Sequence, residues 1–368
     1  EIFADASLRQ PVQQHDSIAW PSRGFSVHVI ATGLQPGRDH WYRFTCGNAV
    51  SRVGHTRTAP APDAGVRRLR LALASCQHYE QGFFAAHRDI AAQDLDFVLF
   101  VGDYIYEGSS PAYTARQHGS PTPHTLDAYR ARHALYKGDA DLQAAHAAHA
   151  WIVTLDDHEV VNDYTADREP GHDDTARFLR RRAAAYRAYF EHMPMAIAPE
   201  GPALRIHDRF TWGRLAELWT LDTRQHRSHH ACPDPQRDVG RSVTGCAELA
   251  DPARTMLGGE QERWLQGGLA ASSRRWKLLG APIVASEFIG GSVTSRGAGQ
   301  GAMARMRRDN PDVRHARGDE RGWALVEATP SALHCEMRTA SHPVTADAKF
   351  AVQARFSVEA GRAELQPA

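Results

Sequence analysis

The sequence predicts a layered α/β protein that begins with a small β domain. Before residue 60, apolar and polar residues alternate in short runs, which predicts strands such as residues 25–31 and 39–45. A Pro-, Ala- and Gly-rich stretch at residues 58–65 marks a domain boundary. After it, buried-strand patterns alternate with helical patterns, as in a parallel sheet covered by helices. We therefore expect a partial N-terminal β-sandwich over residues 1–60 and an α/β domain over residues 68–368.

Four apolar runs in the second domain are typical of buried strands, and polar residues follow each of them. They lie at residues 69–74, 96–101, 151–155 and 216–221. Helical periodicity predicts a helix over residues 125–149 that breaks near Gly138, and another over residues 174–193. The arginines at residues 177–182 of the second helix are expected on its solvated face. An apolar run at residues 276–284 and alternating strands towards the C-terminus complete the pattern.

Charge and composition limit the classes of function. The 368 residues include 43 Lys and Arg and 43 Asp and Glu, so the formal net charge is zero. This balance argues against a protein that binds nucleic acid through overall positive charge, and we expect no sequence-specific nucleic acid partner. No run approaches the roughly 18 apolar residues of a membrane helix, so no membrane span is expected. The 21 histidines point instead to metal or acid–base chemistry.

The five cysteines are too few and too far apart for a disulfide scaffold. Cys232 and Cys246 flank a polar loop and can pair if the protein matures in an oxidising compartment. The odd number leaves at least one thiol unpaired, and Cys76 is the candidate. The chain opens at Glu1 without the pattern of a secretory signal, so we expect that any targeting segment has been removed or never existed.

Reactive groups gather at the carboxyl ends of strands in layered α/β proteins, and four predicted strands end in clusters of polar residues. A single Asp after a strand is ordinarily a turn or a helix cap, but four successive clusters of metal-binding residue types favour a metal site. Gly102 lets the backbone turn sharply, so that Asp103 projects over the sheet edge. Tyr106 reaches the same side if a helix begins there. Carboxylate and amide oxygens suit hard cations, while imidazole, phenolate and thiolate suit iron or zinc.

The densest cluster is Asp-Asp-His-Glu at residues 156–159. It is either a helix N-terminus with acidic caps, or a site where one of these groups binds metal or protonates a leaving group. In the second case Asn162 supplies an amide oxygen one turn later. The residues alone favour neither the helix cap nor the functional site.

In this order, the motifs resemble the PhoD-like alkaline phosphatase/phosphodiesterase family. The similarity runs from about residue 25 to residue 361. The matching motifs are Ser75-Cys76-Gln77, residues 102–107 (Gly-Asp-Tyr-Ile-Tyr-Glu), residues 156–159 with Asn162 and Asp163, residues 182–186 with 191–194, residues 221–225 (Leu-Asp-Thr-Arg-Gln) and residues 287–295. One Gly-Asp motif alone would be weak evidence, whereas the ordered set is specific.

This resemblance implies a calcineurin-like metallophosphoesterase domain, a four-layer α/β/β/α sandwich, behind a small N-terminal β-sandwich domain. Such proteins hydrolyse phosphate mono- and diesters and are typically exported. We therefore expect a phosphate ester substrate, a periplasmic or secreted location and a monomer. No covalent intermediate is needed, because the metals activate water, orient the ester and offset charge on the departing oxygen.

The resemblance also implies a centre with iron(III) and calcium(II). Carried over by position, Cys76, Tyr106 and Asp103 would hold the iron, and Asp103 would bridge iron and calcium. Asn162 would bind calcium.

Three further residues match positions around the substrate. Asp157 and His158 would lie in the site near the metals and the substrate, and Arg224 would be a phosphate-facing cation.

The family's Gly-Asp-x-His segment, whose Asp and His bind metal, has no counterpart in the chain, and the interval where it normally lies holds only residues 280–286. Three explanations stay open: a natural deletion that impairs catalysis, an omitted stretch of polypeptide, or substitution by other residues. The nearest candidates for substitution are His226, His229 and His230. The simpler interpretation of these histidines is a solvated, partly cationic surface. The alternative function is thus an impaired relative that keeps the fold and binds phosphate-bearing ligands.

Overall fold

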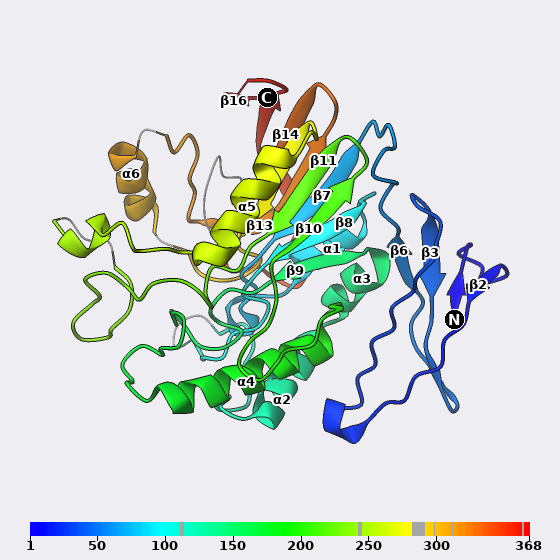
Figure 1. The fold of residues 1–368 in the computed structure, drawn as a ribbon, viewed down its shortest axis with the longest axis horizontal. Coiled ribbons are helices and arrows are strands. Elements are labelled where there is room, and N and C mark those ends of the chain that lie inside the picture. Colours follow the sequence, from blue (N-terminus) through cyan, green and yellow to red (C-terminus); the bar gives the residue numbers. More distant parts are fainter. Residues whose placement is uncertain (111–113, 242–244, 282–290, 298, 311, 363) are drawn as a thin grey trace.

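The computed structural model describes residues 1–110, 114–241, 245–281, 291–297, 299–310, 312–362 and 364–368. Its central element is a seven-stranded sheet with the order β16-β15-β14-β13-β7-β8-β9. Strands β7, β8 and β9 run parallel, and β13 to β16 extend the sheet in antiparallel fashion (Figure 1). The strands are β7 (Leu69–Ala74), β8 (Phe97–Val101), β9 (Trp151–Thr154), β13 (Glu320–Ala328), β14 (Ala332–Ser341), β15 (Ala351–Glu359) and β16 (Leu365–Pro367).

A second sheet of three strands packs against this one. Its order is β10-β11-β12, with β11 and β12 parallel. The strands are β10 (Asp208–Trp212), β11 (Ala216–Thr220) and β12 (Trp276–Gly280). Leu71 and Leu99 of the large sheet share a buried apolar layer with Trp212 and Leu218 of the small one. The apolar run at residues 276–284 thus forms a strand as far as Gly280, and residues 282–284 lie outside the described residues.

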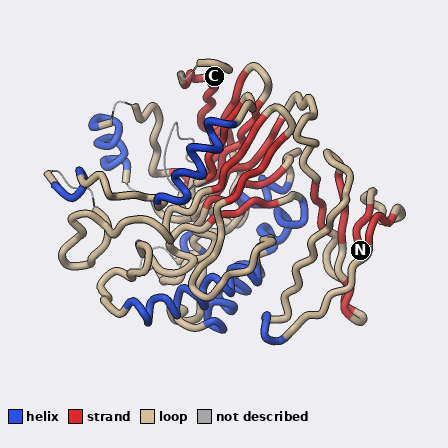
Figure 2. The backbone as a smooth tube through the Cα atoms, in the orientation of Figure 1, coloured by secondary structure: helices blue, strands red, loops and turns tan. Residues whose placement is uncertain are grey.

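Helices cover the outer faces of both sheets (Figure 2). One layer consists of α1 (Ala85–Ala91), α2 (Leu126–Lys137), α3 (Ala140–Ala148) and α4 (Thr175–His192). Its Tyr129 and Tyr189 share a core with Phe100 and Trp323 of the large sheet. On the other side, α5 (Gly259–Ala271) packs Leu265 against the small sheet. The predicted four-layer α/β/β/α sandwich is confirmed.

The predicted break in the helix over residues 125–149 is also confirmed. Helix α2 ends at Lys137 with Gly138 as its C-cap, and the carboxylate of Asp139 accepts hydrogen bonds from the backbone of the first turn of α3. The remaining helices are α6 (Gln300–Asp309) and the short 3-10 helices η1 (Pro21–Arg23), η2 (Tyr79–Gln81) and η3 (Ala247–Ala250). Among the helices of the described segments, none is long and apolar enough to cross a membrane.

The expectation of a solvated arginine face on α4 is wrong for two residues. Arg181 is buried, and its Nη1 lies 2.6 Å from Oε1 of Glu169. Arg182 is buried too, and it donates hydrogen bonds to the backbone carbonyls of Ala166 and Pro202. A guanidinium can be buried when a carboxylate or backbone carbonyls satisfy its donors, so these arginines fix the loop that follows β9 onto α4.

The N-terminal part forms a separate four-stranded sheet, to the right of the core in Figure 1. Its order is β2-β1-β3-β6, from β1 (Ile2–Phe3), β2 (Pro11–Gln13), β3 (Asp39–Tyr42) and β6 (Gly54–Arg57), and a hairpin of β4 (Thr45–Cys46) and β5 (Ala49–Val50) lies beside it. The predicted strand over residues 25–31 is wrong: the segment makes no strand pairing, and the His28 ring instead stacks on Phe190 of α4 with 4.2 Å between centroids.

Candidate functional site

The site begins where the parallel strands β7 and β8 end next to each other. The backbone N–H of Cys76 donates to the carbonyl of Gly102 (3.1 Å), and that of Gln77 donates to the carbonyl of Asp103 (3.1 Å). Three residues at these two strand ends have a left-handed backbone, with φ of +58° at Cys76, +91° at Gly102 and +58° at Asp103. A side chain at Gly102 would place Cβ 2.6 Å from Cβ of Asp156, so this position requires glycine.

This backbone brings a thiol, a carboxyl and a phenol together. Sγ of Cys76 lies 3.3 Å from Oδ2 of Asp103, and Oη of Tyr106 donates to the same oxygen at 2.7 Å. Asp103 and Tyr106 are buried, and Cys76 is half-buried. Tyr106 was expected to reach this side if a helix began there; no helix begins at Tyr106, yet its hydroxyl reaches the Asp103 carboxylate, which follows a left-handed backbone at Asp103.

The third strand adds the residues that follow β9. One donor atom each of Asp103, Asp157 and His158 lie within 4.8 Å of one another. Nδ1 of His158 lies 2.7 Å from Oε2 of Glu107, and the imidazole packs 4.1 Å from the ring of Tyr106. Residues 157–160 form a turn rather than a helix start, so these residues are not the acidic caps of a helix.

The electrostatics of this group favour a bound cation. Burial raises the pKa of the Asp103 carboxyl, and burial together with the Asp103 charge raises the pKa of Cys76 and Tyr106 well above their usual values. Burial lowers the pKa of His158, but the charges of Asp103 and Glu107 outweigh burial and raise it well above its usual value. A cation among these donors would favour their ionised forms, and thiolate, phenolate and carboxylate together fit a highly charged metal ion.

Asn162 and Arg224 lie at the edge of this group. Asn162 is exposed, and its backbone N–H donates to Oε1 of Glu107 at 2.8 Å. Arg224 is buried, with Nε 2.5 Å from Oδ1 of Asp156 and Nη2 3.2 Å from Oδ1 of Asp157.

A third carboxylate completes the surroundings of Arg224. Nη1 of Arg224 lies 3.5 Å from Oδ1 of Asp163. Burial opposes the charged guanidinium, but Asp156 and Asp157 outweigh burial and raise its pKa further. The donors of Arg224 are therefore directed at carboxylates of the protein itself.

Comparison with known proteins agrees with this geometry. The family model described as "PhoD-like phosphatase" matches residues 71–287, and the one described as "PhoD-like phosphatase, N-terminal domain" matches residues 1–60. The chain belongs to the PhoD-like phosphatase family. It is 42% identical to alkaline phosphatase D of Bacillus subtilis (strain 168) over 302 residues, which is 80% of this chain and 51% of that protein. The chain thus spans about half the length of the curated relative that it matches.

A solved structure described as "Structure of PhoD" is also similar. It aligns with the whole of this chain and with 84% of its own length, at a TM-score of 0.91 and 32% sequence identity. The family resemblance expected from the motifs is therefore confirmed, in sequence and in fold.

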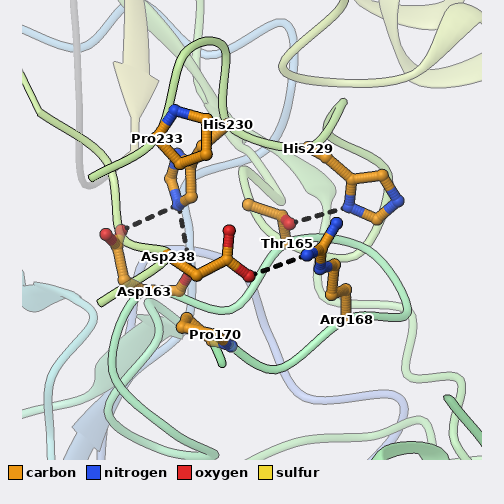
Figure 3. Close-up of a pocket in the computed structure, with 8 residues that line it drawn as sticks. All are labelled: Asp163, Thr165, Arg168, Pro170, His229, His230, Pro233 and Asp238. Atoms are coloured by element: carbon orange, nitrogen blue, oxygen red, sulfur yellow. Dashed lines mark hydrogen bonds and ion pairs between the residues drawn. The ribbon is translucent and has the colours of Figure 1, made fainter. Parts of the chain in front are cut away.

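In this PhoD-like chain, the histidine cluster lies beyond Arg224 and not among Cys76, Asp103 and Tyr106. His229 and His230 line a small polar pocket (Figure 3). Its lining residues are Asp163, Thr165, Arg168, Pro170, His229, His230, Pro233 and Asp238. Nε2 of His230 lies 3.2 Å from Oδ1 of Asp163, whereas His226 is exposed. The pocket therefore connects to the site through Asp163.

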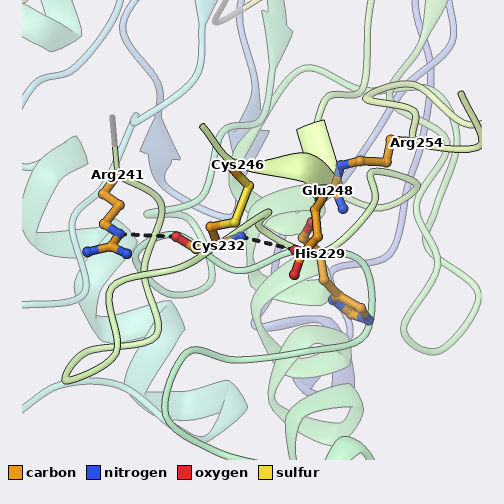
Figure 4. Close-up of a disulfide and its surroundings, with 6 residues drawn as sticks. All are labelled: His229, Cys232, Arg241, Cys246, Glu248 and Arg254. Carbon is orange, nitrogen blue, oxygen red and sulfur yellow. Dashed lines mark hydrogen bonds between the residues drawn. A yellow bond between two sulfur atoms is a disulfide. The ribbon is translucent and has the colours of Figure 1, made fainter. Parts of the chain in front are cut away.

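A disulfide closes the loop that forms one wall of this pocket (Figure 4). Cys232 and Cys246 are bonded, as their positions allowed, and Nε of Arg241 donates to the carbonyl of Cys232 at 3.1 Å. Within the loop, the backbone N–H of Gly240 donates to Oδ2 of Asp163 at 2.6 Å. The closed loop thus holds the carboxylate that faces Arg224.

Sequence reasoning missed several residues that shape the PhoD-like site. Glu107 orients His158, and the buried carboxylate of Glu159 accepts hydrogen bonds from the backbone of Tyr104 (2.5 Å) and Asp156 (3.0 Å). Both acids lie inside recognised motifs, which was the available signal. Of the motif at residues 287–295, the part up to residue 290 lies outside the described residues.

The described end of that motif contacts the cysteine loop. The hydroxyls of Ser292 and Ser295 each donate to the carbonyl of Cys76 at 2.8 Å. They therefore fix the backbone that presents the thiol.

Proposed function

We propose that this chain hydrolyses phosphate mono- and diesters with the help of bound metal, as an alkaline phosphatase D-type enzyme. The observation that carries the proposal is the convergence of Cys76 Sγ and Tyr106 Oη on one carboxylate oxygen of Asp103, at 3.3 and 2.7 Å. Membership of the PhoD-like phosphatase family supports the same activity. No membrane or nucleic acid partner is invoked, and the partner is the phosphate ester itself.

Iron(III) and calcium(II) are the metals that we propose for the site. Cys76, Tyr106 and Asp103 would hold iron(III), because soft thiolate and anionic oxygen donors stabilise the ferric state. Asp103 and Asn162 supply the oxygen donors that calcium prefers. Bound metal supplies Lewis acidity, which activates water and stabilises negative charge on the phosphoryl group.

The protein's own groups position protons around this centre. Glu107 accepts a hydrogen bond from Nδ1–H of His158 (2.7 Å), which fixes the imidazole and leaves Nε2 to exchange a proton with the departing oxygen of the ester. Arg224 neutralises the acids around it and keeps Asp157 beside His158. Glu159 fixes the turns that carry Asp103 and Asp156 by accepting backbone N–H groups on both sides.

A direct test uses a chromogenic phosphate monoester and diester with protein loaded with iron and calcium. We expect phosphate release at alkaline pH and a visible phenolate-to-iron absorption band. Tyr106→Phe should abolish the band, whereas the matched control Tyr42→Phe, in the N-terminal sheet, should keep it. Binding of phosphate esters without turnover would support the impaired relative, and a colourless, inactive protein would contradict both functions.

We also propose a periplasmic or secreted location and a monomeric state. The Cys232–Cys246 disulfide supports the location, because such bonds persist in oxidising compartments. Alkylation of free thiols in freshly lysed cells, followed by mass spectrometry, should leave Cys232 and Cys246 unmodified. Light scattering at micromolar concentration should give the mass of one chain.

A further inference from the structure

A second buried arginine lies at the edge of the sheet where the site forms. Strand β13 runs antiparallel to β7, so its N-terminal end lies beside the carboxyl end of β7. Ser292 bridges the two strands there: it pairs with Ser75, and its carbonyl accepts the backbone N–H of Gly322 at 2.9 Å. Arg321, the preceding residue, therefore lies one strand away from the loop that carries Cys76.

The guanidinium of Arg321 is buried and only partly satisfied. The residue is 3% exposed, and Nη1 donates to the carbonyls of Glu320 (2.5 Å) and Gly318 (3.3 Å). Its Nε and Nη2 atoms are buried without a hydrogen-bond partner. These two nitrogens form the same edge of the guanidinium, which is the edge that binds two oxygens of one carboxylate or phosphate.

Nearby acids do not neutralise this charge. Asp319 and Glu320 pair with Arg317 instead, at 2.7 and 3.5 Å. Among the described residues, no carboxylate forms an ion pair with Arg321. Burial lowers the pKa of Arg321, the charge of Asp319 acts against that change, and the charge of Arg296 acts with it. An uncompensated buried cation is costly, and a bound anion would offset the cost.

A glycine lies beside the unpartnered edge of the Arg321 guanidinium. The residue against Nη2 is Gly297, where a Cβ atom would lie 3.4 Å from that nitrogen. Gly297 is exposed, and Ser295, two residues earlier, donates to the carbonyl of Cys76. The segment beside the guanidinium is thus the same segment that supports the thiol of the site.

We infer that Arg321 binds the phosphoryl group of the substrate, with Nε and Nη2 donating to two of its oxygens. The inference rests on the proposed function, since it adds a recognition residue to the same site. Arg224, by contrast, has its donors directed at Asp156, Asp157 and Asp163. Of these two arginines, Arg321 is the one with an unfilled pair of donors.

The test measures binding of inorganic phosphate to the metal-loaded protein by calorimetry, in the wild type, Arg321→Gln and Arg321→Lys. We expect Kd to rise about tenfold to a hundredfold in Arg321→Gln, and KM for a chromogenic ester to rise with it. Arg321→Lys keeps the charge without the paired donors and should recover part of the loss. Arg355→Gln, at an exposed arginine paired with Glu336, is the matched control and should leave Kd unchanged.

Metal content and far-ultraviolet circular dichroism separate recognition from structure. An unchanged phosphate Kd in a folded, metal-replete Arg321→Gln protein overturns the inference while the proposed hydrolysis stands. Arg321-dependent phosphate binding in a protein without turnover supports the inference and overturns hydrolysis. If Arg321→Gln does not fold, the folded Arg321→Lys variant decides in the same way. Wild-type protein that binds no phosphate at millimolar concentration overturns the inference.

Discussion

Two buried arginines on opposite sides of the site show two different uses of the same side chain. Arg224 lies among three carboxylates, and its nearest ion pair is 2.5 Å long. Arg321 has no ion pair among the described residues and keeps two buried nitrogens without a partner. The first arginine therefore neutralises charge within the protein, whereas the second carries charge that a ligand can neutralise.

The two sides also differ in how the chain holds them. On the Arg224 side, a disulfide-closed loop binds Asp163 through Gly240, so covalent and polar contacts combine. On the Arg321 side, the support consists of serine hydroxyls and strand-end hydrogen bonds around Cys76. Changes on the first side should chiefly affect stability, and changes on the second side should chiefly affect ligand binding.

The largest effect should come from Asp103, the carboxylate on which the side chains of the site converge. Asp103→Asn keeps the size of the side chain but removes the charge on which Cys76 and Tyr106 converge. We expect loss of bound metal and a fall in kcat/KM of about a thousandfold or more. Elemental analysis and ester hydrolysis measure both. Asp94→Asn, at an exposed acid paired with Arg68, should change neither, and metal retention in Asp103→Asn would contradict the assignment.

The second prediction sets the two arginines directly against each other. Arg224→Gln leaves Asp156, Asp157 and Asp163 without their cation, and we expect the free energy of unfolding in urea to fall by about 3–5 kcal/mol. Arg321→Gln removes an uncompensated charge and should lower it by no more than about 1 kcal/mol. Equal destabilisation by both variants would mean that Arg321 has a structural role like that of Arg224.

The sequence predicted the parts of the site that depend on strand ends. Polar residues directly after β7, β8 and β9 must meet at one edge of a parallel sheet, so Cys76, Asp103 and His158 could be expected together. The helical break at Gly138 was equally readable from local patterns. In both cases the deciding interactions are local or follow from strand order.

Features that depend on long-range contacts could not be predicted in this way. Residues 25–31 alternate like a strand, but in the fold His28 stacks on the ring of Phe190 and the segment does not pair with a neighbouring strand. Arg181 looks like a surface residue until Glu169, on another segment, is placed beside it. The sequence did not indicate Arg321 either, because its role is inferred from two buried nitrogens without a hydrogen-bond partner, which only the structure reveals.

The disulfide gives the next prediction and tests the claim that the Arg224 side governs stability. The double variant Cys232→Ser/Cys246→Ser frees the loop that binds Asp163 and should lower the free energy of unfolding by about 3 kcal/mol. Phosphate affinity, which we assign to the other side, should change by less than about twofold. Cys46→Ser, at an exposed unpaired cysteine, is the control. A tenfold loss of phosphate affinity in the double variant would show that the two sides are coupled.

The smallest expected effect concerns His230, whose Nε2 donates to the carbonyl of Asp163 at 3.0 Å. His230→Gln removes this support and should cost about 1 kcal/mol of stability while metal content stays unchanged. His226→Gln, at an exposed histidine, should cost less. The two variants also test whether His230 replaces the histidine ligand of the Gly-Asp-x-His segment, which the chain lacks. If His230→Gln removed metal and lowered kcat/KM as strongly as Asp103→Asn, His230 would have taken the place of the missing histidine ligand, and the Arg224 side would bind metal as well as stabilise the fold.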